Sequence, residues 1–154
     1  MHGRIYEIRT QRLDNELWMN ETDLYDEVDG SWCDYVANSD DRKDDLEWLK
    51  SALPKSMFKV EGDVVEVISD GREFVDEWID DLKKEVNALS YDKFTDLMDV
   101  YHIKMKMNNM IGFDMMFKTD YSDYPHNPTS FIKDCINQYQ GKKLYVCGIV
   151  DYHF

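Results

Sequence analysis

The chain has 154 residues, of which 43% are hydrophobic and 14% aromatic, and its formal net charge is −14. This apolar content is too high for an intrinsically disordered protein, and the length suits one folded domain with one core. The negative charge repels phosphate and anionic lipid, so the composition argues against direct nucleic-acid binding and against binding to a membrane surface.

The first element that the pattern predicts is a strand at residues 3–10, GRIYEIRT, which is rich in β-branched and aromatic side chains. An acidic segment follows at residues 14–48. It holds thirteen acidic and two basic residues and therefore carries most of the net charge. Within it, Ser39 is expected to cap a helix over residues 40–53, and Pro54 is expected to end that helix.

The clearest local prediction is a β-hairpin at residues 57–68, MFKVEGDVVEVI. Gly62 and Asp63 suit a two-residue turn, because glycine tolerates the positive φ that such a turn needs. This turn sets three cross-strand pairs: Val60 with Val65, Phe58 with Val67, and Lys59 with Glu66. The last pair joins opposite charges, which favours the same register.

Two amphipathic helices are predicted after the hairpin. Residues 72–89 place apolar side chains at helical spacing opposite charged ones, so this helix is expected to pack on an apolar surface. Ser90 is expected to cap a second helix that runs to about Met107. The methionine-rich stretch 104–117 is expected to fill the core. The alternative is an adaptable binding surface, because methionine reshapes easily around a partner.

The last part of the chain predicts a strand, a helix and a strand. Apolar side chains alternate over 111–117, Asn127 and Pro128 are typical of the start of a helix, and residues 144–150 are almost continuously apolar. The elements do not alternate regularly enough for a doubly wound sheet. We therefore expect a single α+β domain, residues 1–154, with a mixed or mostly antiparallel sheet of about five strands, packed helices, and the two terminal strands paired in mid-sheet.

The sequence also predicts a compartment. The N-terminus, MHGRIYEIRT, lacks the apolar region of a signal peptide, and no apolar run approaches the roughly 20 residues of a membrane-spanning helix. Cys33, Cys135 and Cys147 form no CxxC pair and are odd in number, so reduced thiols are expected. These features favour a cytoplasmic protein that does not contact a membrane.

Motifs for cofactors and metals are missing. The glycines form no phosphate-binding loop and the histidines have no metal-ligating spacing, so we expect no cofactor and no metal. The acidic stretch DLYDEVDGSWCDY fails the EF-hand pattern, which would need an oxygen ligand at Tyr25 and a bidentate glutamate at Val36. An irregular divalent site in this stretch stays an alternative to simple solvated charge.

One pair of residues supports a catalytic hypothesis. Asp151 and His153 lie two apart on the last predicted strand, so their side chains point to the same face. The alternative function is therefore a small enzyme, a hydrolase that uses carboxylates with Asp151 and His153, with or without a divalent metal. The simpler reading is that these residues form the polar end of a strand. A catalytic thiol at Cys33 is disfavoured by the carboxylates around it.

The acidic segment supports the leading hypothesis, which is protein binding. Its carboxylates would steer a basic partner, and its aromatic side chains are of the kind that dominate interface energetics. We therefore expect a non-enzymatic protein that binds a basic protein partner through residues 14–48, as an inhibitor, an immunity protein or a DNA mimic. The candidate contact residues are Trp18, Asp23, Tyr25, Asp26, Glu27, Asp29, Trp32, Asp34 and Tyr35. The alternative is that the aromatic side chains point inward and the carboxylates only keep the protein soluble.

Three short stretches carry a resemblance: GRIYEIRT at residues 3–10, DYV at 34–36 and GIVDYHF at 148–154. In these stretches the chain resembles a family of uncharacterised acidic proteins carried by mobile elements of gut bacteria. The resemblance implies no activity. It implies a setting in which small acidic proteins act as inhibitors of host defence or as immunity partners of toxins.

Overall fold

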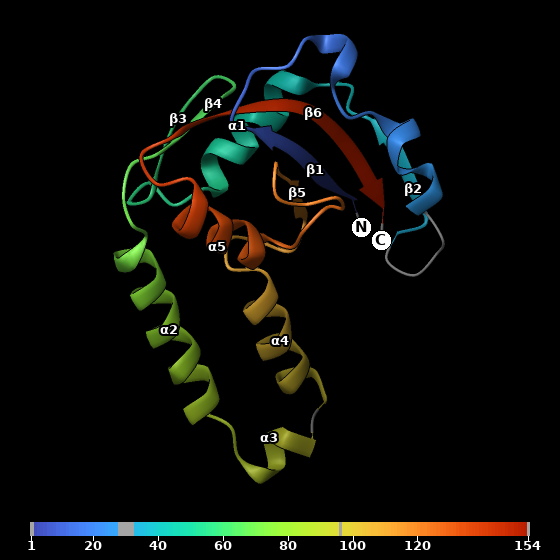
Figure 1. Ribbon diagram of the computed structural model, residues 1–154. Coiled ribbons are helices and arrows are strands. Elements are labelled where there is room, and N and C mark those ends of the chain that lie inside the picture. The colour runs from blue at the N-terminus through green and yellow to red at the C-terminus, as the bar shows by residue number, and fades with distance from the viewer. Residues whose placement is uncertain (1, 28–32, 96, 154) are drawn as a thin grey trace.

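The computed structural model describes residues 2–27, 33–95 and 97–153, with the backbone alone for residues 25–27 and 97. A mixed β-sheet forms the body of the molecule, and a pair of helices projects from it (Figure 1). The strands are β1 His2–Arg9, β2 Tyr35–Asn38, β3 Phe58–Glu61, β4 Val64–Val67, β5 Met115–Lys118 and β6 Lys143–His153. The α-helices are α1 Arg42–Ala52, α2 Arg72–Asn87, α3 Tyr91–Thr95, α4 Leu97–Asn108 and α5 Pro128–Gln138, and two 3-10 helices are η1 Asn15–Leu17 and η2 Glu21–Glu27.

The two terminal strands lie side by side in the middle of the sheet. The strand order is β3-β4-β6-β1-β5, with β6 antiparallel to β1 and β5 parallel to β1. The long strand β6 pairs with β4 near its beginning and with β2 near its end. The predicted α+β class, the mixed sheet and the mid-sheet pairing of the termini are confirmed, and the sheet has six strands.

The predicted hairpin has the predicted register. Val60 pairs with Val65, Phe58 with Val67, and Lys59 with Glu66. Gly62 has a φ of 59°, in the left-handed region that favours glycine. Turn chemistry and side-chain alternation indicate the same pairing here, which is why the local sequence sufficed.

Two clusters of buried side chains stabilise the two faces of the sheet. The larger one packs α1 and α5 against the sheet and includes stacked Phe117 and Phe131 rings whose centroids are 4.1 Å apart. The smaller one lies on the opposite face, where Met19 and Leu24 from the acidic segment cover Ile5 and Val150. The acidic segment therefore contributes to both faces, because Leu46 and Trp48 of α1 also belong to it and pack against the larger cluster.

Helix starts were predicted with mixed success. Asn127 caps α5, since its side chain accepts a hydrogen bond from the Ser130 amide at 3.0 Å. The cap of α1 was predicted wrongly: it is Asp41, whose carboxylate accepts from the Asp44 amide at 3.1 Å. Ser39 instead bonds to the side chain of Asp45. Both Ser39 and Asp41 suit a cap, and the sequence alone does not rank them.

We call residues 72–108, with α2, α3 and α4, the helical arm. Figure 1 shows α2 and α4 leaving the sheet together, with α3 at the far end. No residue of α2 or α3 is buried, and every residue of these two helices is described. The helix predicted at 72–89 is α2, and its apolar face is half-buried: Phe74 packs against the larger cluster, and α2 lies beside α4.

Candidate functional site

Glu7 fastens the acidic segment to the sheet. The register of β1 against β6 shifts between Tyr6 and Ile8, so Glu7 lies at an irregularity that redirects its side chain. The side chain of Glu7 is 3% exposed. Its carboxylate accepts hydrogen bonds from the backbone amides of Met19, at 2.7 Å, and Gly148, at 3.1 Å. One buried carboxylate therefore joins strand β1, strand β6 and the acidic segment.

The acidic segment crosses β6 at Gly148, and the crossing requires glycine. A Cβ atom at this position would lie 2.2 Å from the Met19 carbonyl oxygen, far inside van der Waals contact. Arg9 completes the anchor, since its guanidinium donates to the other oxygen of Glu7 at 2.9 and 3.1 Å. Breaking the hydrogen bonds of a buried carboxylate lowers the stability of the fold. The position of the acidic segment relative to β6 is therefore fixed at this crossing.

Asp45 provides a second anchor on the opposite face of the sheet. This buried side chain accepts from the Arg4 guanidinium at 2.7 Å and also bonds to Ser39. Arg4 in turn donates to Asp151 at 2.8 Å. The Tyr6 hydroxyl donates to the Asp45 backbone carbonyl at 2.9 Å. The N-terminal end of α1 is thereby fixed to β1 and β6.

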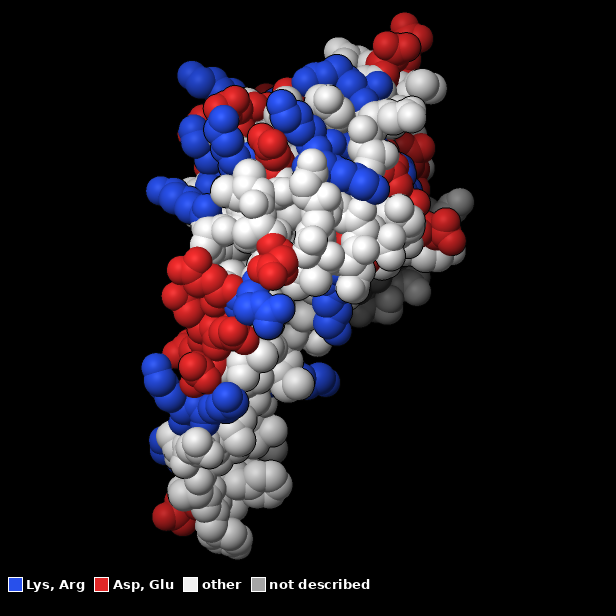
Figure 2. Space-filling view, turned by 60° about the vertical axis from the view of Figure 1, so that its left-hand side comes forward, with Lys and Arg blue, Asp and Glu red and all other residues white. Residues whose placement is uncertain are grey.

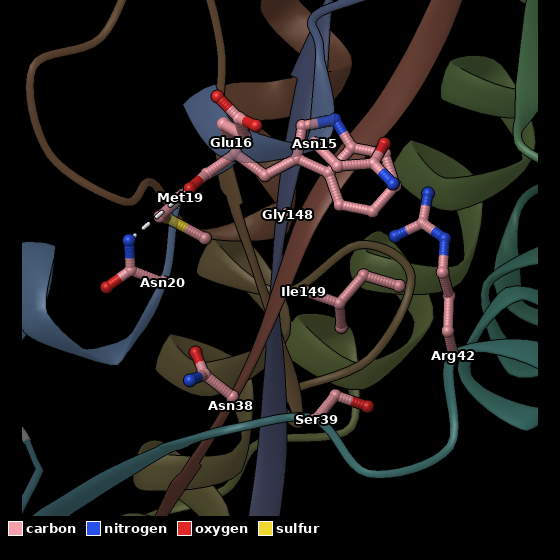
Figure 3. A pocket seen from close by; sticks show the side chains of 10 residues that line it. Asn15, Glu16, Met19, Asn20, Asn38, Ser39, Arg42, Gly148 and Ile149 are labelled. Carbon is pink, nitrogen blue, oxygen red and sulfur yellow. Dashed lines mark hydrogen bonds between the residues drawn. The ribbon is translucent and has the colours of Figure 1, made fainter.

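A cavity of about 270 Å³ lies between the two anchors, where η1, the start of α1 and β6 meet (Figure 3). The Arg42 guanidinium extends along one wall and lies 4.3 Å from the Trp18 ring. It donates to the Cys147 and Val146 carbonyls at 2.5 and 2.6 Å, and burial lowers the pKa of Arg42. Asn20 and Ser39 also hydrogen-bond within the chain. The cavity therefore lies where two parts of the acidic segment adjoin β6.

The candidate contact residues are distributed unevenly. Asp23, Asp34 and Tyr35 are exposed, the last by 52%. Trp18 is half-buried, where it stacks on Arg42 and donates to the Leu13 carbonyl at 3.1 Å. Asp29 and Trp32 lie outside the described residues. The structure describes only the backbone of the three others, Tyr25, Asp26 and Glu27, within η2.

The catalytic pair of the alternative hypothesis lies at an exposed end of the sheet. Asp151 contacts Arg4, whereas His153 Nδ1 lies 2.8 Å from an Asp34 oxygen. This hydrogen bond to His153 lowers the pKa of Asp34. His2 links the two, because its Nδ1 lies 3.4 Å from Asp151 and its ring lies edge-on to His153. The side chains of Asp151 and His153 are 23% and 39% exposed, and those of His2 and Asp34 are both more than half exposed, so water reaches this group.

The cysteines are buried. Burial raises the thiol pKa of both Cys135 and Cys147, which makes these thiols poor nucleophiles. Cys33 is also buried, in the smaller cluster. Among the described residues, no group of three or more His, Cys, Asp or Glu side chains is placed to hold a metal ion.

The helical arm is an exposed surface that sequence reasoning did not single out. Figure 2 shows acidic side chains gathered over α2, where Glu73, Asp76, Glu77 and Asp80 recur at helical spacing and are all exposed. Lys106 of α4 bridges to α2, with 2.5 Å contacts to Asp81 and Glu85. The low burial of α2 and α3 could not be read from the sequence, since periodicity identifies an apolar face without saying what covers it.

Aromatic and methionine side chains are exposed on the other helices of the arm. They are Tyr91, Phe94, Met98, Tyr101 and Met107. Large apolar side chains grouped on a surface mark interaction sites more often than isolated ones do. The methionine-rich stretch is divided: Met115 is buried in the core, whereas Met107 is exposed on α4.

Two further findings bear on the setting of the protein. Within the described part of the chain, no helix is both long enough and apolar enough to cross a membrane. Comparison of the chain with protein-family models, with curated proteins and with solved structures finds no match.

Proposed function

We propose that the protein is a non-enzymatic binding protein that captures a positively charged protein in the cytoplasm through the acidic segment, residues 14–48. The observation that supports this most is the anchoring of the segment by two buried carboxylates, Glu7 and Asp45. A segment held at two points is preorganised. It loses less conformational entropy on binding than a solvated acidic tail would lose.

The chemistry of the segment suits a basic partner. Asp40, Asp44 and Glu47 are exposed on or next to α1, where they add to the negative field that speeds encounter with a cationic surface. Tyr35 offers an exposed aromatic anchor on β2. An inhibitor, an immunity protein and a DNA mimic would all use this arrangement, and each fits the mobile-element setting that the sequence resemblance implies.

The test is capture of partners from the native host, with matched variants. The wild-type protein is immobilised at low salt and bound proteins are identified by mass spectrometry. We expect a basic partner that is released as the salt concentration approaches about 1 M, where the screening length falls to about 3 Å. The triple variant Asp40→Asn, Asp44→Asn, Glu47→Gln and the single variant Tyr35→Ala should each lose most of that partner.

The control removes the same charge from another element. Glu73→Gln, Asp76→Asn, Glu77→Gln on α2 changes the net charge equally but leaves the acidic segment intact. This variant should retain the partner. If both triple variants lost the partner equally, the interaction would depend on net charge alone. That result would contradict a specific binding surface at residues 14–48.

A further inference from the structure

Two histidines face each other across the central strands of the sheet. His2 is the first residue of β1 and His153 is the last residue of β6, and the two are direct partners in the antiparallel register. Opposed residues of paired strands point to the same face, with their Cβ atoms about 4.5–5.5 Å apart. Both side chains are more than a third exposed, so an ion in solution can reach them. Sequence spacing does not reveal this pair, because only the strand pairing brings the two residues together.

The distance between the two rings matches that of two ligands on one metal ion. Their centroids are 5.1 Å apart, and the ring planes meet at 65°. In a tetrahedral site with metal–nitrogen distances of about 2.0–2.1 Å, the centroids of two imidazole ligands lie about 5 Å apart. The backbone therefore already holds the rings at the separation that a shared ion needs.

Each histidine also has a carboxylate at its Nδ1 atom. Asp34 lies 2.8 Å from His153 Nδ1, and Asp151 lies 3.4 Å from His2 Nδ1. A histidine that binds a metal almost always donates its other ring N–H to a carboxylate, a backbone carbonyl or water, which fixes the tautomer and the ring orientation. When Nδ1 donates its hydrogen to an aspartate, Nε2 carries the lone pair that a metal ion requires. The two aspartates therefore favour coordination through Nε2 in both rings.

The surroundings of the pair favour a cation. Arg4 donates to Asp151 at 2.8 Å and to the buried Asp45 at 2.7 Å, so the carboxylate beside His2 is itself held in place. Such hydrogen bonds to the outer carboxylates are a regular feature of metal sites. The net charge of −14 adds a field that attracts cations from solution. Local geometry and the charge of the whole chain thus act in the same direction.

We propose that His2 and His153 bind one divalent transition-metal ion through their Nε2 atoms, with Asp34 and Asp151 orienting the rings. Imidazole suits Zn²⁺, Ni²⁺ and Cu²⁺, whereas Mg²⁺ and Ca²⁺ prefer oxygen ligands. No group of three or more ligating side chains is placed to hold a metal in the described part of the chain, so water fills the other coordination positions. The ion joins β1 to β6 and needs no protein partner, so this proposal can fail while capture of a basic partner succeeds, and the reverse.

Calorimetric titration of the full chain with Zn²⁺, Ni²⁺, Cu²⁺ and Mg²⁺ tests the site. We expect one equivalent of Zn²⁺ or Ni²⁺ to bind with a dissociation constant below about 1 mM. Cu²⁺ should bind more tightly than either, because nitrogen ligands follow that order of affinity. Mg²⁺ should not bind in the same range. Zinc and nickel that bind no better than Mg²⁺ would overturn the proposal.

Single variants locate the bound ion. His2→Gln and His153→Gln should each weaken Zn²⁺ binding about tenfold or more, because each removes one of two ligands. The matched control is His102→Gln, which removes an exposed histidine of α4 and should bind Zn²⁺ as the wild type does. Asp34→Asn keeps both ligands but removes an orienting carboxylate, and such a change typically weakens metal binding about 10–100-fold. Circular dichroism should show that all four variants fold like the wild type.

A second measurement reports on stability. An ion that binds only the folded chain raises the midpoint of thermal unfolding by mass action. Added Zn²⁺ should therefore raise the midpoint of the wild type and of His102→Gln, but not that of His2→Gln or His153→Gln. Zinc binding that survives in both of these variants, or that is lost equally in His102→Gln, would place the ion elsewhere and contradict the site.

Discussion

The acidic segment and the helical arm contrast in how they meet the rest of the molecule. The acidic segment has the composition of a solvated region, yet Met19, Leu24, Cys33 and Val36 of this segment are buried, and two buried carboxylates fasten it to the sheet. The arm contains the chain's most regular amphipathic helix, yet no residue of α2 is buried, all of them being described. The region with the more polar composition thus contains buried side chains, whereas the amphipathic helix α2 contains none.

This difference in burial has a physical reason. A carboxylate can be buried where backbone amides or a guanidinium satisfy it. The donors for Glu7 come from the neighbouring Arg9, from Met19 in the acidic segment, and from Gly148, which lies 141 residues further along the chain. The apolar side chains of α2, such as Ile79, are only half-buried, because α4 covers this face in part. Local sequence encodes the character of each face, while its surroundings depend on the course of the whole chain.

The largest expected effect concerns the Glu7 anchor. Glu7→Ala leaves the buried amides of Met19 and Gly148 without their acceptor and removes the buried partner of the Arg9 guanidinium, which keeps only the Thr119 carbonyl and Asp120, so the free energy of unfolding should fall by about 3–5 kcal/mol. The matched change on the arm, Glu77→Ala, removes an exposed carboxylate and should alter it by less than about 0.5 kcal/mol. Urea denaturation of both variants measures the difference. A similarly small decrease in the free energy of unfolding for both variants would show that Glu7 does not hold the acidic segment on the sheet.

A pair of helix variants compares burial directly. Leu49 of α1 is fully buried in the larger cluster, so Leu49→Ala should cost about 2–5 kcal/mol. Ile79 of α2 is only half-buried, so less apolar area is lost by Ile79→Ala and its cost should be about 1 kcal/mol. The same denaturation experiment serves for both. A cost at Ile79 equal to that at Leu49 would mean that the arm is packed more tightly than its exposure indicates.

Amide hydrogen exchange should resolve the two regions residue by residue. Elements with few buried contacts open at lower free energy than the core does. Amides of α2 and α4 should therefore exchange at least about tenfold faster than those of β1 and β6 in dilute solution. Uniform protection over the whole chain would contradict a separately opening arm.

The smallest effect is a pH dependence of the pair formed by Arg12, after β1, and Asp63, in the turn between β3 and β4. The hydrogen bond from Arg12 to Asp63 lowers the pKa of that carboxyl below its ordinary value. A carboxyl with a depressed folded-state pKa stabilises the fold above its ordinary pKa of about 3.9, and this contribution disappears as pH falls through the folded-state pKa. Asp63→Asn should therefore lower the midpoint of thermal unfolding slightly at pH 7 but not near pH 2. An equal decrease at both pH values would assign the effect to something other than charge.

Several elements were predictable because local and tertiary preferences agree. Gly62 and the alternating valines specify the hairpin by themselves, and Asn127 followed by Pro128 specifies the start of α5. The apolar run near the C-terminus indicated a central strand, since only a strand covered on both faces needs such a run. Strand β2 escaped notice because a four-residue strand with one buried side chain, Val36, gives no readable alternation.

The candidate site was predictable only in its composition. The sequence shows that residues 14–48 hold most of the charge, and it shows that Trp18 and Tyr35 are available as anchors. It does not show that Arg42 stacks on Trp18 while Tyr35 stays exposed. These two outcomes depend on where β6 passes, and β6 lies more than a hundred residues further along the chain.

The sequence by itself determined the class of the fold, the hairpin register, the central place of the terminal strands and the concentration of negative charge. Each of these follows from short-range periodicity, turn chemistry or composition. The tertiary structure alone decided which carboxylates are buried, which aromatic side chains face solvent, and that α2 and α4 project as an arm. Burial is a property of what surrounds a side chain, and the surroundings are supplied by residues that are distant in sequence.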